Sequence, residues 1–449
     1  MATLSLPWGE GTFACRLPEH WKLQQVADTA LQPAGPDWPR RLASAINQPV
    51  SGPPLAKLLQ ARRNGKVLLI VEDMTRHSPL PEILDVLLRE IHHADVPDEN
   101  LQVLFATGMH PAMTAEQARR KIGRLAETLR WRSNPWRDAD AYAPLGRAGA
   151  LEVAVDRGVL EADLRIVISS VSPHLQAGFG GGYKMFVPGC ASLETIRALH
   201  RLGVERRPRP LAGTVAEDNR MRSAIDAAGA RIEQAGGATF AVQYVLDEHD
   251  LPTHIAAGEL LPVQRMLAKQ CAAACGVVVE EPADVLITNA HPRDYDLWQS
   301  FKCIANTRWA ARPNGVILCT TRCEAGLHGM DVPPWPLSPT WTRRAVRLLG
   351  HAALASLITR AAPSLAGDAA FFVQMGLQAI HRNPILLVSP ALHASAQRFP
   401  GLDLFASFEE AVAAATDLLG GGPQRVIAFP NGGATFPVLP GTHAARRPT

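Results

Sequence analysis

The sequence predicts an α/β fold with two domains, each a mainly parallel sheet flanked by helices, and an active site in the interdomain cleft. Residues 66–72, 101–106 and 164–171 are apolar runs of buried-strand length. An amphipathic helix pattern separates the first two runs, with Leu84 and Ile91 on its apolar face. Strands that alternate with helices in this way are typical of doubly wound parallel sheets.

A similar alternation recurs later in the chain. We expect a strand at 284–288, a helix from about Tyr295, and further strands at 315–320, 385–389 and 426–429. These elements predict a second α/β domain.

The domain boundaries follow from the two series of strands. A length of 449 residues allows two or three domains, each with its own core. We expect an N-terminal α/β domain over residues 1–275 and a C-terminal α/β domain over 276–440, followed by a disordered tail over 441–449. Between the strands, the stretch 125–160 is predicted to be rich in loops, and residues 203–237 are predicted to be helical.

The composition is that of an ordinary globular protein, with 47% hydrophobic and 19% charged residues. The formal net charge of +3 is spread along the chain, which argues against nucleic acid as a partner. The first residues lack a signal-peptide pattern, and there is no uninterrupted apolar run of membrane-spanning length. We therefore expect a cytoplasmic protein without a membrane partner.

The seven cysteines are odd in number and scattered, which fits a reducing compartment better than a disulfide framework. Two pairs are spaced C-x-x-x-C, Cys271/Cys275 and Cys319/Cys323. These pairs could hold a metal, but buried small residues are the preferred interpretation.

Polar side chains follow each of the three strands in the N-terminal half. Asp73 and Arg76 follow the first strand, His110 follows the second, and His174 and Lys184 follow the third. Ligands of parallel sheets bind beyond the carboxyl ends of the strands, so these residues predict one small-molecule site.

The third strand runs into a glycine-rich loop that contains Gly178, Gly180, Gly181 and Gly182. Such glycines permit positive φ angles and a close approach of a ligand, so a loop that cradles phosphate is expected, with a plain strand-to-helix turn as the alternative. Met185 stands where a P-loop has Ser or Thr, and the glycine spacing differs from the dinucleotide fingerprint. A helix after the loop carries His200.

Four motifs together resemble the nickel-pincer lactate racemase family (LarA-like). They are EDMTR at 72–76, TGMHP at 107–111, SPHLQAGFGGGYKMFVPG at 172–189 and PRDYDLWQSFK at 292–302. The resemblance runs through both expected domains in the same order and at similar separations, and the motif at 172–189 is the most specific.

The resemblance implies a nickel pincer nucleotide, pyridinium-3,5-bisthiocarboxylic acid mononucleotide nickel, covalently attached through Lys184. It implies His200 as a nickel ligand and His110 and His174 as the catalytic acid/base pair. Further cofactor contacts are expected from Asp73, Thr75, Gly178, Gly181 and Gly182, and substrate contacts from Arg76, Gln299 and Lys302. The implied partners are a small hydroxy acid and the cofactor-synthesis enzymes; a homo-oligomer is left open.

The chemistry of the residues agrees with this resemblance. The C–H bond of a 2-hydroxy acid is barely acidic, so removing a hydride while a base takes the hydroxyl proton is easier than removing a proton from carbon. Imidazole groups suit this base near neutral pH. Arg76 and Lys302 can bind the carboxylate, and nickel suits imidazole nitrogen with soft sulfur donors. We therefore expect a racemase or epimerase of a lactate-like or larger 2-hydroxy acid.

Several positions depart from the family pattern. His77 replaces a proline, Gly180 a serine, and His291 and Trp298 stand where tyrosines are usual. The changes at 77, 291 and 298 lie near the expected substrate pocket and favour another 2-hydroxy acid or a polyol-type substrate over lactate. The alternatives are a dehydrogenase or lyase on the same scaffold, or a non-catalytic paralogue that binds a nucleotide or small acid.

Overall fold

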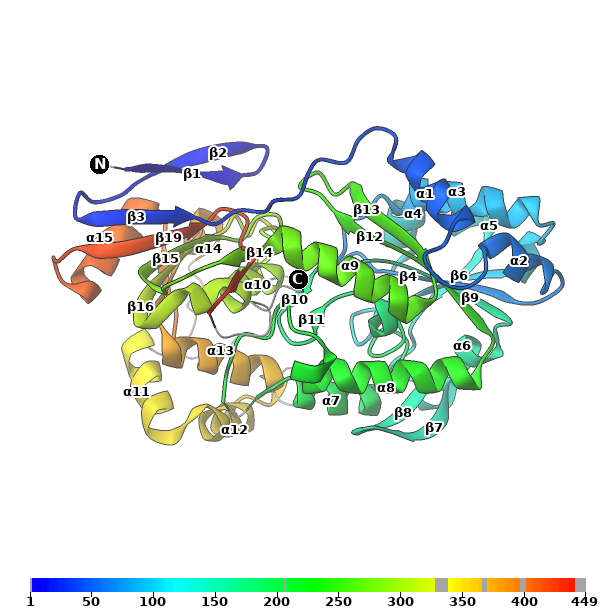
Figure 1. The fold of residues 1–449 in the computed structure, drawn as a ribbon. Helices are drawn as coiled ribbons and strands as arrows, with labels where there is room; N and C mark the ends of the chain where they lie inside the picture. The colour runs from blue at the N-terminus through cyan, green and yellow to red at the C-terminus, as the bar shows by residue number, and fades with distance from the viewer. Residues whose placement is uncertain (1, 206, 328–337, 366–369, 396–400, 441–449) are drawn as a thin grey trace. The chain divides into compact units, whose positions relative to one another are not determined.

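The computed structural model describes residues 2–205, 207–327, 338–365, 370–395 and 401–440, so the expected tail at 441–449 lies outside the described residues. The chain forms two compact units, and each is described by itself (Figure 1). Unit 1 comprises Met1–Ala30, Val204–Gly213 and Ala274–Thr449. Unit 2 comprises Leu31–Gly203 and Thr214–Ala273.

This division differs from the predicted boundary at its N-terminal end. Residues 1–30 group with the C-terminal part of the chain, because β3 (Trp21–Val26) pairs in parallel with β19 (Gln424–Phe429). The two strands lie side by side in Figure 1, and the Ala30 amide donates to the Ala274 carbonyl at 2.7 Å. Pairing between segments so far apart in sequence leaves no local pattern to read.

Unit 2 is built on a six-stranded sheet of order β13-β12-β9-β4-β5-β6, parallel except for the β12–β13 pair. Its strands are β4 (Val67–Val71), β5 (Leu101–Phe105), β6 (Arg130–Ser133), β9 (Leu164–Ser170), β12 (Ala238–Leu246) and β13 (Pro252–Gly258). The three strands predicted in the N-terminal half are therefore present as β4, β5 and β9. The stretch 125–160, predicted to be loop-rich, contains β6 and an antiparallel hairpin of β7 (Tyr142–Ala148) and β8 (Leu151–Asp156).

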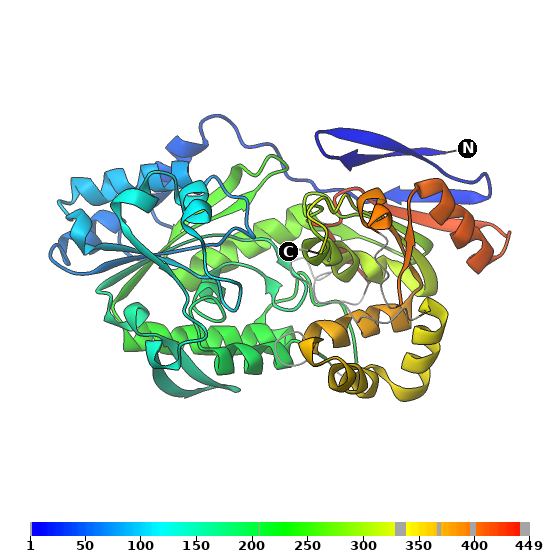
Figure 2. The ribbon, with the colours of Figure 1, turned by 180° about the vertical axis from the view of Figure 1, so that it is seen from behind.

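The helices of unit 2 lie on both faces of this sheet (Figures 1 and 2). They are α1 (Trp38–Asn47), α2 (Leu55–Gln60), α3 (Leu80–His93), α4 (Ala115–Ile122), α5 (Leu125–Thr128), α6 (Arg157–Glu161), α7 (Leu193–Leu202), α8 (Arg220–Ala235) and most of α9 (Leu260–Cys275). The prediction of a helix over 203–237 is confirmed for α8 alone; among the described residues of 203–219, the one helical segment is the short 3-10 turn Ala216–Asp218.

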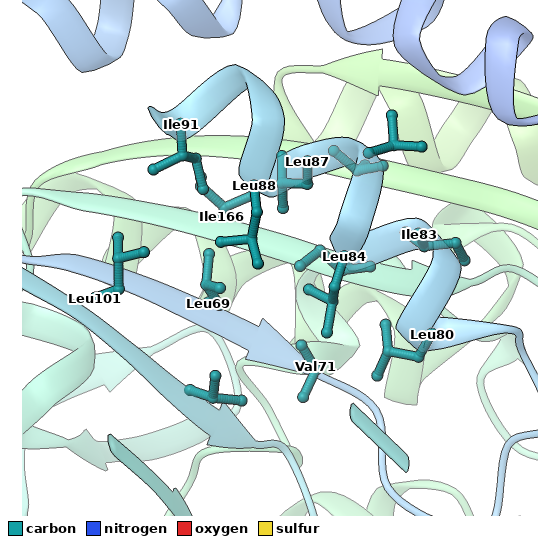
Figure 3. Close-up of a cluster of buried hydrophobic side chains, with 14 of the residues drawn as sticks. Leu69, Val71, Leu80, Ile83, Leu84, Leu87, Leu88, Ile91, Leu101 and Ile166 are labelled. Carbon is teal, nitrogen blue, oxygen red and sulfur yellow. The ribbon is translucent and has the colours of Figure 1, made fainter. Parts of the chain in front are cut away.

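The core of unit 2 holds α3 against the strands that lead to the candidate site. Leu84, Leu87 and Ile91 of α3 point toward Leu69 of β4 and Ile166 of β9, and all of them are buried (Figure 3). Arg165, which precedes Ile166 on β9, points to the opposite face of the sheet, where its Nη1 donates to the Ile232 carbonyl of α8 at 3.2 Å. This alternation places α3 and α8 on opposite faces.

Unit 1 contains a six-stranded parallel sheet of order β18-β17-β16-β15-β19-β3. The strands not yet located are β15 (Ala283–Asn289), β16 (Ala311–Thr320), β17 (Ile385–Val388) and β18 (Asp403–Phe405). The helices are α10 (Leu297–Thr307), α11 (Pro339–Leu349), α12 (His351–Ala361), α13 (Ala370–Arg382), α14 (Pro390–Ala394) and α15 (Phe408–Leu419). Short two-stranded pairs complete it, β1 (Thr3–Trp8) with β2 (Gly11–Arg16) and β14 (Gly276–Val278) with β20 (Phe436–Val438).

All seven cysteines are buried, as the packing interpretation predicted, and none forms a disulfide. None of the helices in the described stretches of the chain is long and apolar enough to cross a membrane.

Candidate active site

Three neighbouring strands bring the predicted polar residues to one edge of the unit 2 sheet. β9, β4 and β5 are adjacent and parallel, with Val71 of β4 in register with Ile168 of β9 and with Phe105 of β5. Their carboxyl ends therefore meet at the same edge. The segments that carry Asp73, His110 and His174 all leave the sheet there.

Asp73 and His110 form a direct pair across the ends of β4 and β5. The His110 Nδ1 atom lies 2.6 Å from Asp73 Oδ2, while Asp73 Oδ1 accepts from the Thr75 amide at 3.0 Å and from the Thr75 hydroxyl at 2.5 Å. Burial alone would raise the pKa of the Asp73 carboxyl, but His110, then Arg76 and the Thr75 hydroxyl, hold that pKa well below its usual range. An ionised Asp73 accepts the Nδ1 proton, so in the neutral form of the His110 ring the lone pair is on Nε2.

A second buried network supports the loop that carries Arg76. Glu72 Oε2 accepts from the Ser170 amide at 2.9 Å and from the Ser170 hydroxyl at 3.0 Å, and Lys121 Nζ lies 3.8 Å from Glu72 Oε1. Lys121 Nζ also donates to the Arg76 carbonyl at 2.6 Å. Sequence reasoning missed Lys121 and the role of Glu72, because the contacts join residues 45 and 98 positions apart.

Arg76 is half-buried and is oriented by its neighbour. Its Nη1 donates to the Thr75 hydroxyl at 3.0 Å and to the Thr75 carbonyl at 3.2 Å. Within the described residues the Nε–Nη2 edge of the guanidinium has no protein acceptor. That edge has the fork geometry that binds a carboxylate through two hydrogen bonds.

His174 has a different environment from His110. Its Nδ1 accepts from the Gln176 amide at 3.2 Å and from the Ala177 amide at 3.0 Å. Because a backbone N–H can only donate, Nδ1 carries no proton and the hydrogen of the neutral ring is on Nε2. His110 is therefore arranged to accept a proton at Nε2, and His174 to donate a hydrogen bond from Nε2.

The glycine-rich loop contains positive φ angles at Gly178, Gly181 and Gly182, which its sequence permits. A Cβ on Gly178 would lie 2.0 Å from the Thr214 carbonyl oxygen, and one on Gly182 would lie 2.6 Å from Gln264 Cγ. Close packing against protein atoms therefore already requires glycine at both positions. A cofactor contact at these glycines stays a prediction.

Lys184 and His200 lie close enough to each other for their charges to interact. Burial, followed by the charges of Arg76 and Arg222, lowers the pKa of Lys184 to about 7, although Asp73 acts in the opposite direction. Burial, followed by the charges of Lys184 and His110, lowers the pKa of His200 to about 3. At neutral pH the site therefore presents a neutral imidazole, which can bind a metal, and an amine of which about half is neutral and able to act as a nucleophile.

The residues fit a cofactor that brings its own metal donors. Among the described residues there is no group of three or more His, Cys, Asp or Glu side chains that could hold a metal ion. His200 offers one imidazole donor, and Lys184 Nζ has no hydrogen-bond acceptor in the described part of the chain. A single protein ligand beside a nucleophilic lysine matches a covalently anchored metal complex better than a metal ion bound by protein alone.

Gln299 and Lys302 belong to unit 1, on α10. As the i, i+3 spacing predicted, they share one face of the helix, and Lys302 Nζ donates to Gln299 Oε1. Trp298, one of the positions that depart from the family pattern, packs its ring on Phe372 of α13 with the centroids 4.0 Å apart. A role of these residues in substrate binding stays a prediction.

Comparison with known proteins supports the resemblance to lactate racemases that the sequence motifs indicated. A family model described as the lactate racemase N-terminal domain matches residues 8–210. The lactate racemase of Thermoanaerobacterium thermosaccharolyticum is 26% identical over 348 residues, 75% of this chain and 78% of that protein. The lactate racemase of Lactiplantibacillus plantarum is 23% identical over 333 residues, 73% and 76% of the two chains.

Solved structures show the same fold. The lactate racemase apoprotein from Thermoanaerobacterium thermosaccharolyticum superposes with a TM-score of 0.81 at 20% identity, covering 97% of this chain and all of that one. A protein from Thermotoga maritima superposes with a TM-score of 0.61 at 17% identity, covering 89% and 98% of the two chains.

The fold, the residues at the strand ends and these relatives define an isomerase of the racemase class. Residues 8–210 match the lactate racemase N-terminal domain, and the chain is similar to lactate racemases over about three quarters of its length, as its motifs indicated.

The lowered pKa of Lys184 predicts unusual reactivity at neutral pH. Reductive methylation with formaldehyde requires the neutral amine, and a pKa of about 7 leaves about half of the Lys184 amine neutral at pH 7. We expect the ratio of methylation at pH 7 to methylation at pH 9 to be several-fold higher for Lys184 than for the exposed Lys66, as measured by peptide mass spectrometry. Equal ratios would contradict the environment described for Lys184.

The lowered pKa of the Asp73 carboxyl predicts that the stability of the folded chain depends on pH in the acid range. Its pKa is lower in the folded chain than in the unfolded chain, so its contribution to stability is complete above the unfolded value of about 4 and is lost as the pH falls below it. The difference in free energy of unfolding between wild type and Asp73→Asn should shrink as the pH falls from about 5 toward 3. Denaturant titrations measure this difference. Asp417→Asn, at an exposed position, is the control, and an Asp73→Asn difference that does not change with pH would refute the prediction.

Proposed function

We propose that the protein is a racemase or epimerase of a lactate-like or larger 2-hydroxy acid that uses a nickel pincer nucleotide attached through Lys184. The observation that carries this proposal is the cluster of a nucleophilic lysine, a neutral buried imidazole and an Asp73–His110 pair at one sheet edge. When bound, the cofactor supplies a metal centre that can accept and return a hydride. The named relatives are lactate racemases, which supports a substrate of this class.

The residues of the chain then act on the substrate by binding and by proton transfer. We propose that Arg76 binds the carboxylate through its Nε–Nη2 edge, while Lys121 and Thr75 fix the position of Arg76. His110 takes the hydroxyl proton at Nε2, and the ionised Asp73 stabilises the imidazolium that forms. Loss of this proton together with a hydride from the carbon would give a 2-oxo acid. Return of a hydride to the opposite face of the carbon, and of the proton from the His110 imidazolium to the oxygen, would complete the inversion.

The remaining residues complete the proposal. The resemblance implied an acid/base role for His174; because its Nδ1 accepts from two amides, we propose instead that His174 donates a hydrogen bond from Nε2 to the oxygen that alternates between hydroxyl and carbonyl. We assign Gln299 and Lys302 to substrate binding, Asp73, Thr75, Gly178, Gly181 and Gly182 to the surroundings of the cofactor, and His200 to nickel. Loading requires cofactor-synthesis enzymes, and we propose a cytoplasmic location for the protein.

Cofactor attachment has a direct test. Protein made together with the pincer-synthesis enzymes should show a mass increase of the size of the cofactor and about one bound nickel. Both should be lost in Lys184→Ala, because no amine remains to form the bond, and retained in Lys269→Ala, where the lysine is exposed. Intact mass spectrometry and metal analysis measure them. Absence of adduct and nickel in wild type, while a known lactate racemase loads in the same cells, would reject the cofactor and favour the non-catalytic paralogue.

The reaction itself predicts where the carbon-bound hydrogen goes. With loaded enzyme and single enantiomers of lactate and larger 2-hydroxy acids in D2O, the inverted product should keep its original C2 hydrogen, because a hydride leaves and returns without reaching solvent. Chiral chromatography and mass spectrometry measure inversion and label together. His110→Ala should lower the rate by about 10²–10⁴-fold, the usual contribution of a general base. Solvent deuterium at C2 would instead indicate proton abstraction from carbon and overturn the hydride mechanism.

A further inference from the structure

The start of helix α8 holds the loop that follows His174. Asn219 is the N-cap of α8, where its Oδ1 accepts from the Arg222 amide at 2.9 Å. Its Nδ2 donates to the Gln176 carbonyl at 2.8 Å, and Arg222 Nε donates to the Ala177 carbonyl at 3.0 Å. Arg222 Nη2 also donates to the Phe179 carbonyl. Two side chains one turn apart therefore fix three backbone carbonyls of one loop.

One of these peptide groups connects Asn219 directly to His174. The Gln176 carbonyl and the Ala177 amide belong to the same planar peptide, so fixing the carbonyl also fixes the direction of the N–H. That N–H donates to His174 Nδ1 at 3.0 Å. A hydrogen bond to the carbonyl also polarises the peptide and strengthens the bond that its N–H makes. Asn219 thus acts on the imidazole through one intervening peptide.

Burying the polar side chains of Asn219 and Arg222 costs free energy unless hydrogen bonds replace their contacts with water. Asn219 is 2% exposed and Arg222 is 1% exposed. Burial lowers the pKa of Arg222 to about 10, with Asp226 opposing the shift, so the guanidinium stays charged at neutral pH. Its ion pair with Asp226 is long, at 3.6 Å, and two of its nitrogens are used on loop carbonyls. A planar guanidinium can reach two carbonyls at once, which a lysine cannot.

We propose that Asn219 and Arg222 are positioning residues that hold His174 in its neutral Nε2–H tautomer through the peptides of residues 176–180. The proposal rests on the proposed function only for the consequence of this tautomer. His110, held at Nδ1 by Asp73, accepts a proton at Nε2, whereas His174, held at Nδ1 by two amides, donates at Nε2. The two histidines are thereby kept in complementary states.

The variants are chosen to separate loop holding from helix capping. Asn219→Asp keeps an oxygen that caps α8 but removes the donor to Gln176, and Asn219→Ser is a second variant with a good N-cap residue but a shorter side chain. Arg222→Lys retains the charge but reaches one carbonyl rather than two. The matched control is Asn383→Asp in unit 1, since the buried Asn383 side chain also donates to two backbone carbonyls, those of Arg312 and Gly315.

The readout is the imidazole nitrogen spectrum of the chain without cofactor. With ¹⁵N-labelled histidine, and with the His174 signals assigned by comparison with His174→Gln, wild type should show an unprotonated Nδ1 and a protonated Nε2. Asn219→Asp and Asn219→Ser should shift His174 toward a mixture of tautomers, and Arg222→Lys should shift it less. Asn383→Asp should leave these signals unchanged, because a general loss of stability does not reach this peptide.

Two outcomes would overturn the proposal. One is a wild-type His174 with its proton on Nδ1. The other is an unchanged His174 spectrum in folded Asn219→Asp and Asn219→Ser proteins. Neither outcome depends on catalysis, so failure of the proposed function would appear separately, as absence of cofactor loading or of racemisation with a normal His174 spectrum.

Discussion

The parallel register of β9, β4 and β5 is the constraint on which the candidate site depends. Adjacent strands lie about 4.8 Å apart, so residues that follow their carboxyl ends are within reach of one another. The contact of 2.6 Å between His110 and Asp73 is a direct consequence of the pairing of β4 with β5. Both faces of β4 and β9 are buried, so a slip of one residue would exchange the side chains that face α3 with those that face the opposite side of the sheet. The packing of α3 on Leu69 and Ile166 opposes such a slip.

The electrostatics of the site follow from crowding several basic groups around one carboxylate. Lys184, His200 and Arg222 all have lowered pKa values, and burial is the largest cause for each. Asp73 opposes the shift at Lys184 and Asp226 opposes the shift at Arg222, while the pKa of Asp73 itself is lowered by His110, Arg76 and the Thr75 hydroxyl. As a result the two groups assigned to the cofactor are available in neutral form near pH 7, where a protonated amine could not attack and a protonated imidazole could not bind metal.

The sequence predicted the elements that have a local residue pattern, and it missed the contacts between residues that are far apart in the chain. Apolar runs and the polar residues after them identified β4, β5 and β9, because burial on both faces leaves a continuous apolar pattern. Two features have no such pattern: the pairing of β3 with the unit 1 sheet, and the hydrogen bond from Asn219 to the Gln176 carbonyl, 43 positions away. The sequence pattern identified the glycines of the loop as a cradle for a ligand. This explanation is incomplete, because packing against Thr214 and Gln264 already requires glycine at positions 178 and 182.

Under the proposed function, anchoring of the cofactor and binding of its metal are one event rather than two. A lone imidazole binds a divalent ion weakly, and His200 has no neighbouring set of protein ligands among the described residues. In that case the metal would arrive with most of its donors, and covalent attachment at Lys184 would supply the high effective concentration that makes one further ligand sufficient. Under this proposal, the close placement of Lys184 and His200 at the carboxyl ends of the strands would be needed first for attaching the cofactor and only then for catalysis.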